Sequence, residues 1–148
     1  VLEVKLQTLL EEWQPAQLKS VGSIKGIGKR ATAMLIVFTQ GFRHTHSHRQ
    51  LISFAGLSPT EYSSGSSIQG RPRIYKRGGK NLRDVLYMCS MNAIRTNMAC
   101  KTLYERLRAN GKTGKQALIA VCNKLLKQVF AVVKSNSLYQ PNYCSPKP

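Results

Sequence analysis

Apolar residues recur along this chain mostly at helical spacing, and their pattern predicts a mainly α fold. In residues 2–13 they stand three or four positions apart, which places them on one face of an amphipathic helix. Pro15 either ends this helix or begins the next one. We therefore interpret residues 1–14 as the end of a longer helix and residues 15–135 as a compact helical domain.

Two glycines interrupt the apolar pattern in residues 16–40. Leu18 and Ile24 lead to Gly26-Ile27-Gly28, and a helix of small and apolar residues follows from Ala31. This arrangement is typical of a helix-hairpin-helix, in which backbone N–H groups at the start of the second helix approach a DNA phosphate. An ordinary connection with glycine as a C-cap is the alternative. The residues predicted to bind nucleic acid here are Gly26, Gly28, Lys29 and Arg30.

Capping and breaking residues predict the ends of three further helices. Ser47 can cap a helix that ends near Gly56. After Gly78-Gly79, apolar residues from Leu82 to Ile94 predict a helix of about five turns. Another helix follows and is stopped by Asn110-Gly111.

The last helix is expected to be the centre of a helical core over residues 81–135. From Ala117 to Val133 the sequence is apolar nearly all round, which is typical of a buried helix. Thr113 and Gln116 have the spacing of a capping box that would start it. The polar, proline-containing residues 136–148 predict a flexible tail.

Residues 58–80 are rich in serine, glycine and arginine, and their glycines argue against a long helix. Four serines surround Gly65, and five basic side chains follow with no acid among them. Hydroxyl groups can donate to a phosphate or attack it, and cations neutralise its charge. We predict a loop or short hairpin that acts on phosphate, with a plain solvated linker as the alternative. The candidate nucleic-acid-binding residues are Ser66, Ser67, Arg71, Arg73, Lys76, Arg77 and Lys80.

The charge balance favours a polyanionic partner. The chain has 23 Lys and Arg residues against 6 Asp and Glu residues, a formal net charge of +17. Such an excess repels itself unless a polyanion neutralises it, so nucleic acid is the leading class of partner. An anionic membrane is less favoured, because the basic residues are spread over several segments and no apolar run reaches membrane-spanning length.

No metal-binding residue is predicted in this chain. His44, His46 and His48 alternate as strand ligands would, but no carboxylate between Trp13 and Thr60 could orient them. The four cysteines form no C-x-x-C pair, and three lie in helical patterns typical of buried thiols in a reducing cytoplasm. The six acids are scattered, so a self-sufficient metal-dependent nuclease site is not expected.

Several blocks of sequence, taken in order, resemble one protein family over residues 18–135. The blocks are Ser23-Ile24-Lys25-Gly26-Ile27-Gly28, Phe54-Ala55-Gly56-Leu57-Ser58-Pro59, Tyr62-Ser63-Ser64-Gly65-Ser66-Ser67, Lys76-Arg77-Gly78, Tyr104-Glu105-Arg106-Leu107 and Lys124-Leu125-Leu126. They are similar to the C-terminal transposase domain of bacterial insertion-sequence recombinases that are described as bridge-RNA-guided, with pilin-gene invertases as relatives. On this resemblance, residues 1–14 become the end of a linker or coiled-coil helix and residues 15–135 the transposase domain.

The resemblance implies a specific chemistry. Ser64 would be the nucleophile that joins the cut DNA strand. The whole family protein also has a RuvC-like half, whose acidic site would bind Mg²⁺ and act from another subunit of a homo-oligomer. A guide RNA would select the DNA by base pairing. Gln69 departs from the family pattern, because a basic residue is expected before Gly70.

Three functions remain open from the sequence. The first is a DNA-binding catalytic domain of a cytoplasmic transposase or site-specific recombinase, which binds nucleic acid but does not recombine it alone. The second is a non-catalytic helix-hairpin-helix module, and the third is a basic structural or RNA-associated protein. Chemistry alone leaves Ser63, Ser66 and Ser67 as rival nucleophiles, and ranks Tyr62 and Tyr75 lower because no Arg-His-Arg arrangement is readable.

Overall fold

The computed structural model of the chain describes residues 1–60, 73–74 and 79–141. Within these residues the fold is mainly helical, as predicted. The helices are α1 (Leu2–Trp13), α2 (Pro15–Gly22), α3 (Lys29–Phe38), α4 (His48–Phe54), α5 (Lys80–Thr96), α6 (Met98–Ala109) and α7 (Gly114–Ser135). Two short strands, β1 (Pro59–Thr60) and β2 (Arg73–Ile74), pair antiparallel, with Pro59 opposite Ile74 and Thr60 opposite Arg73.

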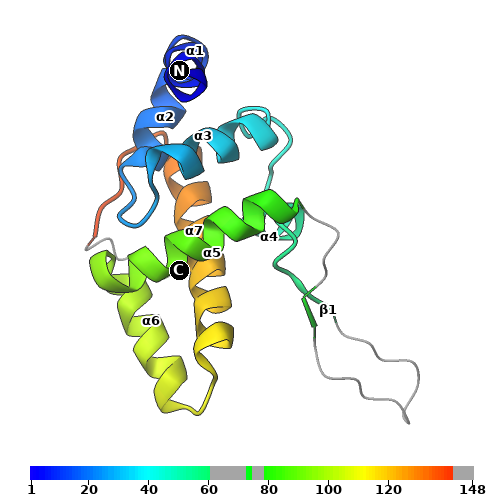
Figure 1. Cartoon of the computed structure of the whole chain (residues 1–148), viewed down its shortest axis with the longest axis vertical. Helices are drawn as coiled ribbons and strands as arrows, with labels where there is room; N and C mark the ends of the chain where they lie inside the picture. Colours follow the sequence, from blue (N-terminus) through cyan, green and yellow to red (C-terminus); the bar gives the residue numbers. More distant parts are fainter. Residues whose placement is uncertain (61–72, 75–78, 142–148) are drawn as a thin grey trace.

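The long helix α7 forms the centre of the fold, which confirms the prediction (Figure 1). It packs against α2, α4, α5 and α6. Ile119 and Phe130, which the pattern also placed in the core, are only partly buried. The ring of Phe130 meets the edge of His48 from α4, with centroids 6.3 Å apart, at the margin of the core. The buried residues of α7 are Ala117, Leu118, Val121, Cys122, Leu125, Leu126, Val129 and Val132.

One expectation about α7 needs correction. From the sequence we expect no apolar run of membrane-spanning length, yet by length and composition alone α7 could cross a membrane, with a mean hydropathy of 1.4 over an 18-residue window. Lys124 and Lys127 interrupt the run, but the average over the helix stays high. Within the fold, 44% of the apolar window is buried against other parts of the chain, as is usual for the core helix of a globular domain.

Side-chain caps determine where several helices begin. Ser47 Oγ accepts a hydrogen bond of 3.2 Å from the Gln50 N–H at the start of α4, as predicted. The predicted capping box of α7 is also present: the Thr113 N–H donates to Gln116 Oε1 over 3.1 Å, and the Gln116 N–H donates to Thr113 Oγ1 over 3.3 Å. These bonds satisfy backbone groups that a helix end would otherwise leave unpaired.

The first helix, α1, lies at one end of the molecule and leaves most of its apolar face uncovered (Figure 1). It packs on α2 and α3, and Leu10 is its one buried residue. Leu2 and Leu9 are 81% and 61% exposed, and Trp13 is 44% exposed. The apolar spacing therefore predicted the helix correctly, but only one of its positions enters the core.

Candidate nucleic-acid interface

The region predicted as a helix-hairpin-helix folds as two helices joined by a short turn. α2 ends at Gly22 and α3 begins at Lys29, and the two helices pack on each other. We call residues 23–28, which connect them, the turn. The Ile27 N–H donates to the Ile24 carbonyl over 3.2 Å, within the turn. Gly26 has φ +103°, a conformation that glycine adopts without the strain imposed by a Cβ atom.

The turn packs directly against α5. A Cβ atom built on Gly26 would lie 2.6 Å from Ala93 Cβ and 2.9 Å from Ala93 Cα. Real Cβ atoms do not come that close, so glycine at position 26 is what lets the turn approach α5. Within the chain, Gly26 therefore packs against another helix, α5. A contact between Gly26 and a phosphate stays a prediction.

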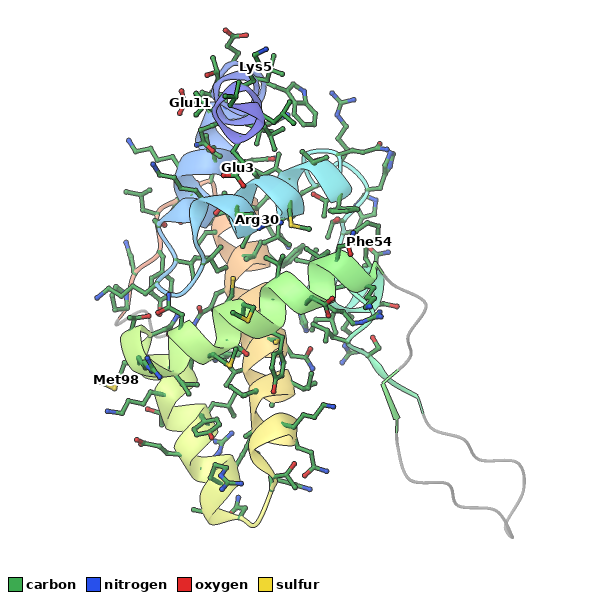
Figure 2. All side chains as sticks on the ribbon, in the orientation of Figure 1. Glu3, Lys5, Glu11, Arg30, Phe54 and Met98 are labelled. Carbon is green, nitrogen blue, oxygen red and sulfur yellow. The ribbon has the colours of Figure 1, made fainter. Side chains whose placement is uncertain are left out.

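Gly28 has a different environment. It is exposed, it occupies the N-cap position of α3 with φ −83°, and a Cβ atom added to it would meet nothing within 4 Å. No side chain caps α3, so its first backbone N–H groups are not satisfied by a cap. Lys29 and Arg30 follow immediately and are exposed. Figure 2 labels Arg30 on α3. The start of α3 thus combines the positive end of a helix dipole with two cations, a combination that suits an anion.

A buried asparagine holds the turn from the side of α6. Asn97 is 1% exposed. Its Nδ2 group donates to the Lys25 carbonyl over 3.1 Å and to Gln128 Oε1 over 2.9 Å. Its Oδ1 atom accepts from the Cys100 N–H over 3.4 Å, which caps α6, and from the Tyr139 hydroxyl over 3.2 Å. One side chain therefore connects the turn, α6, α7 and the segment after α7.

The segment after α7 returns to the same turn (Figure 1). The Tyr139 N–H donates to Ser23 Oγ over 2.8 Å, and the Ser23 hydroxyl donates to the Ser20 carbonyl over 2.6 Å. We call residues 137–141 the strap. The strap also borders a cavity of about 460 Å³ beside α7, whose lining includes Lys124 and Gln128.

The second predicted group surrounds the serine-rich loop. Ser64, Ser66, Ser67, Arg71, Lys76 and Arg77 lie outside the described residues. Arg73 is in β2, and Lys80 is the first residue of α5, where it is exposed. No side chain caps α5, whose N-cap residue is Gly79. The strand pair β1–β2 brings residues 59–60 and 73–74, both within the loop region, side by side ahead of α5.

The turn and Lys80, the one candidate of the second group that lies in a described helix, both involve α5. The turn meets α5 at Ala93, and the Gly28 backbone N–H faces the Cys89 thiol. Lys80 begins the same helix. Nine residues separate Lys80 from Cys89, which corresponds to about 14 Å along an α-helix axis. The helix α5 thus sets the spacing between the turn and the end of the loop region at Lys80.

The thiols of the core are not candidates for catalysis. Cys89, Cys100 and Cys122 are buried and free. Burial raises the pKa of Cys100 to about 11 and that of Cys122 to about 12. Burial also raises the pKa of Cys89, although a hydrogen bond from the Gly28 backbone opposes this change. At neutral pH these groups stay protonated and are poor nucleophiles.

The histidines do not assemble a metal site in the described part of the chain. Within those residues, no group of three His, Cys, Asp or Glu side chains is placed to hold a metal ion. His44 and His46 are exposed, and His48 contacts Phe130.

The sequence missed Asn97, Tyr139 and Ser23 as parts of this site. Asn97 directly precedes an apolar helical pattern, so a capping role could have been inferred from the sequence. Its bonds to the turn and to Tyr139 span 72 and 42 residues of chain, respectively. Local spacing carries no signal for contacts of that kind.

Comparison with known proteins identifies the family. Residues 18–105 match the model of the transposase family IS116/IS110/IS902, a span that contains the turn, the serine-rich loop and α5. The chain belongs to this family. The match spans both groups of candidate residues.

Members of the family and their relatives are similar over most of the chain. An uncharacterized 43.6 kDa protein of insertion element IS110 from Streptomyces coelicolor is 30% identical over 94% of this chain and 34% of its own length. The pilin gene-inverting protein of Moraxella lacunata is 34% identical over 78% of this chain and 36% of its own length. An uncharacterized 42 kDa protein of insertion element IS900 from Mycobacterium paratuberculosis is 33% identical over 62% of this chain and 23% of its own length. The chain therefore spans about a third or less of the curated relatives it matches.

Proposed function

We propose that this chain is the DNA-engaging catalytic domain of a transposase or site-specific recombinase, with Ser64 as its nucleophile. The observation that carries the proposal is the family match over residues 18–105, since this span includes both the turn and Ser64. Relatives named as pilin gene-inverting proteins support DNA strand exchange as the class of reaction. The net charge of +17 supports DNA as the partner.

The turn at the start of α3 supplies the proposed DNA contact. Backbone N–H groups of its first turn would donate to a phosphate, while Lys29 and Arg30 neutralise it. Gly28 leaves the approach open, because among the described residues, its chain neighbours aside, no heavy atom lies within 4 Å of a Cβ atom built on it. Such contacts bind the DNA backbone and do not read its sequence. A guide RNA that selects the DNA by base pairing is consistent with that limitation.

The proposed reaction is a transesterification at phosphorus. The Ser64 oxygen forms a bond to the DNA phosphate, and the bond from phosphorus to one strand oxygen breaks. The strand leaves as a free hydroxyl and takes up a proton, while the serine loses one. Arg71, Arg73, Lys76, Arg77 and Lys80 would stabilise the charge that develops on the phosphate, with Ser66 and Ser67 as hydrogen-bond donors. A second strand hydroxyl reverses the step and joins a new pair of strands.

Further parts of the proposal concern the natural protein in full. Mg²⁺ would be held by carboxylates of a RuvC-like region, because the described residues of this chain group no three metal ligands. The exposed apolar face of α1, which includes Leu2 and Leu9, is suited to pack against another helix in a homo-oligomer. Cytoplasmic DNA is the expected substrate.

The test is a search for a covalent protein–DNA adduct. The natural protein in full is incubated with its element DNA and any guide RNA, denatured, and analysed for DNA attached to protein. We expect an adduct that Ser64→Ala abolishes while equilibrium DNA binding changes less than twofold. Ser63→Ala is the matched control and should retain the adduct. An adduct that persists in Ser64→Ala excludes this nucleophile, and the absence of any adduct favours the non-catalytic alternative.

A further inference from the structure

We propose that Asn97 and the strap are positioning elements for the DNA-binding turn. The inference deepens the proposed function and rests on it. Neither Asn97 nor Tyr139 needs to touch DNA, since each contacts the turn itself: Asn97 at the Lys25 carbonyl and Tyr139 at Ser23 Oγ. Their role would be to fix the backbone of residues 23–28, and with it the start of α3, in the orientation that receives a phosphate.

The turn is held from three sides by residues remote in sequence. Asn97 donates to the Lys25 carbonyl over 3.1 Å, and Ala93 packs against Gly26. Tyr139 donates its backbone N–H to Ser23 Oγ over 2.8 Å. Each partner comes from a different element: α5, the cap of α6, and the strap. A turn of six residues, with glycines at positions 26 and 28, would have many alternative conformations without these restraints.

The hydrogen bonds of Asn97 use the whole capacity of its amide. Both its donor bonds and both its acceptor bonds have partners, and the group is buried. A buried polar group whose bonds are all satisfied fixes the orientation of its partners, because any rotation leaves a donor or acceptor unpaired. A cap for α6 alone would need only Oδ1, so the two donor bonds indicate a second role at the turn.

Tyr139 links the strap to this arrangement twice. Its hydroxyl donates to Asn97 Oδ1 over 3.2 Å, and its backbone N–H reaches Ser23. Burial raises the pKa of the Tyr139 hydroxyl, so it remains a donor at neutral pH. The strap therefore couples the region after α7 to the conformation of the turn.

The experiment measures local mobility and DNA affinity in the same variants of this chain. Amide hydrogen exchange is followed at residues 24–28 and, as an internal reference, at the core of α7. Affinity is measured for a duplex of random sequence. Asn97→Asp keeps both acceptor bonds and the cap but loses both donors. Tyr139→Phe removes only the hydroxyl, and Ser23→Ala removes the acceptor for the strap.

We expect exchange in the turn to accelerate and affinity to fall in each variant. Given the usual net contribution of a hydrogen bond, the fall should be about threefold for Tyr139→Phe and Ser23→Ala, which lose one bond to the strap each, and about tenfold for Asn97→Asp, which loses two. Exchange in α7 should stay the same. The matched controls are Tyr104→Phe on α6 and Ser53→Ala on the exposed side of α4, which should change neither quantity.

The possible failures are distinguishable. If Tyr139→Phe and Ser23→Ala leave both the turn and the affinity unchanged, the inference is overturned while the proposed function stands. Equal acceleration in the turn and in α7 would show a general structural role and would also overturn it. If Asn97→Asp does not fold, Tyr139→Phe and Ser23→Ala alone decide whether the inference holds. If the unmodified chain does not bind duplex DNA, the proposed function fails.

Discussion

Gly26 in the turn and Ala93 in α5 are in such close contact that a single methyl group on Gly26 would lie 2.6 Å from the Ala93 Cβ atom. The contact joins the predicted DNA-binding turn to the helix that begins at the serine-rich loop region. It also separates the two glycines of the motif into different roles. Gly26 is required by the fold, whereas Gly28 is not.

This difference predicts that two similar substitutions destabilise the chain to very different extents. Gly26→Ala should lower the free energy of unfolding by about 2–4 kcal/mol, because it places an alanine at a positive φ and creates an overpacked contact with α5. Gly28→Ala should cost about 0.5 kcal/mol, since its φ of −83° suits alanine and its Cβ direction is open. Urea unfolding of both variants tests this. Equal destabilisation would contradict the assigned roles.

Two adjacent leucines of α1 should also differ. Leu10 is 2% exposed and Leu9 is 61% exposed. Leu10→Ala should lower the free energy of unfolding by about 2–4 kcal/mol, as expected for a truncated core leucine. Leu9→Ala should change it by less than about 0.5 kcal/mol in this chain. Thermal unfolding of the two variants provides the comparison, and a large loss from Leu9→Ala would show that α1 packs differently.

The buried thiols predict a loss of stability in alkaline solution. Burial raises the pKa of Cys122 in the folded chain from 9.0 to about 12 and that of Cys100 to about 11. Between pH 9.0 and these raised pKa values, the thiols of the unfolded chain lose protons that the thiols of the folded chain keep, so ionisation favours the unfolded chain. Stability from these groups is fully present below pH 9 and falls as pH rises toward 11 and 12.

The measurement is the free energy of unfolding at pH 8 and pH 10. Each thiol can contribute a fall of up to about 1.4 kcal/mol per pH unit in this range. Lysines and tyrosines also titrate there, so the slope is compared with that of Cys122→Ala, which should be shallower. An equal slope in the variant would contradict a raised pKa at Cys122.

The helices were predictable because their signals are local. The capping box of Thr113 and Gln116, the cap at Ser47 and the apolar spacing of α7 all act within a few residues. The boundary of α3 was less well predicted: the pattern began it at Ala31, but the helix begins at Lys29, directly after the N-cap Gly28. Apolar spacing cannot detect a first helical turn made of basic residues.

The packing of the candidate site could not be predicted. Gly26 was identified by its turn motif, but its contact with Ala93 joins positions 67 residues apart. The bond from Tyr139 to Ser23 spans 116 residues. The composition of residues 136–148 predicts a flexible tail, but Tyr139 within this span forms specific hydrogen bonds to Ser23 and Asn97. Proline and polar residues indicate only that no helix forms there.

The most direct test of the central claim is the salt dependence of duplex DNA binding. Each phosphate contact adds about −0.9 to the slope of log affinity against log salt. The double variant of Lys29→Ala and Arg30→Ala should therefore bind less tightly, with a slope shallower by about 2. The matched control is Lys112→Ala with Lys115→Ala, which removes the same charge from exposed positions around the start of α7. We expect the control to keep the slope of the unmodified chain; equal slopes in the two double variants would contradict a DNA interface at the start of α3.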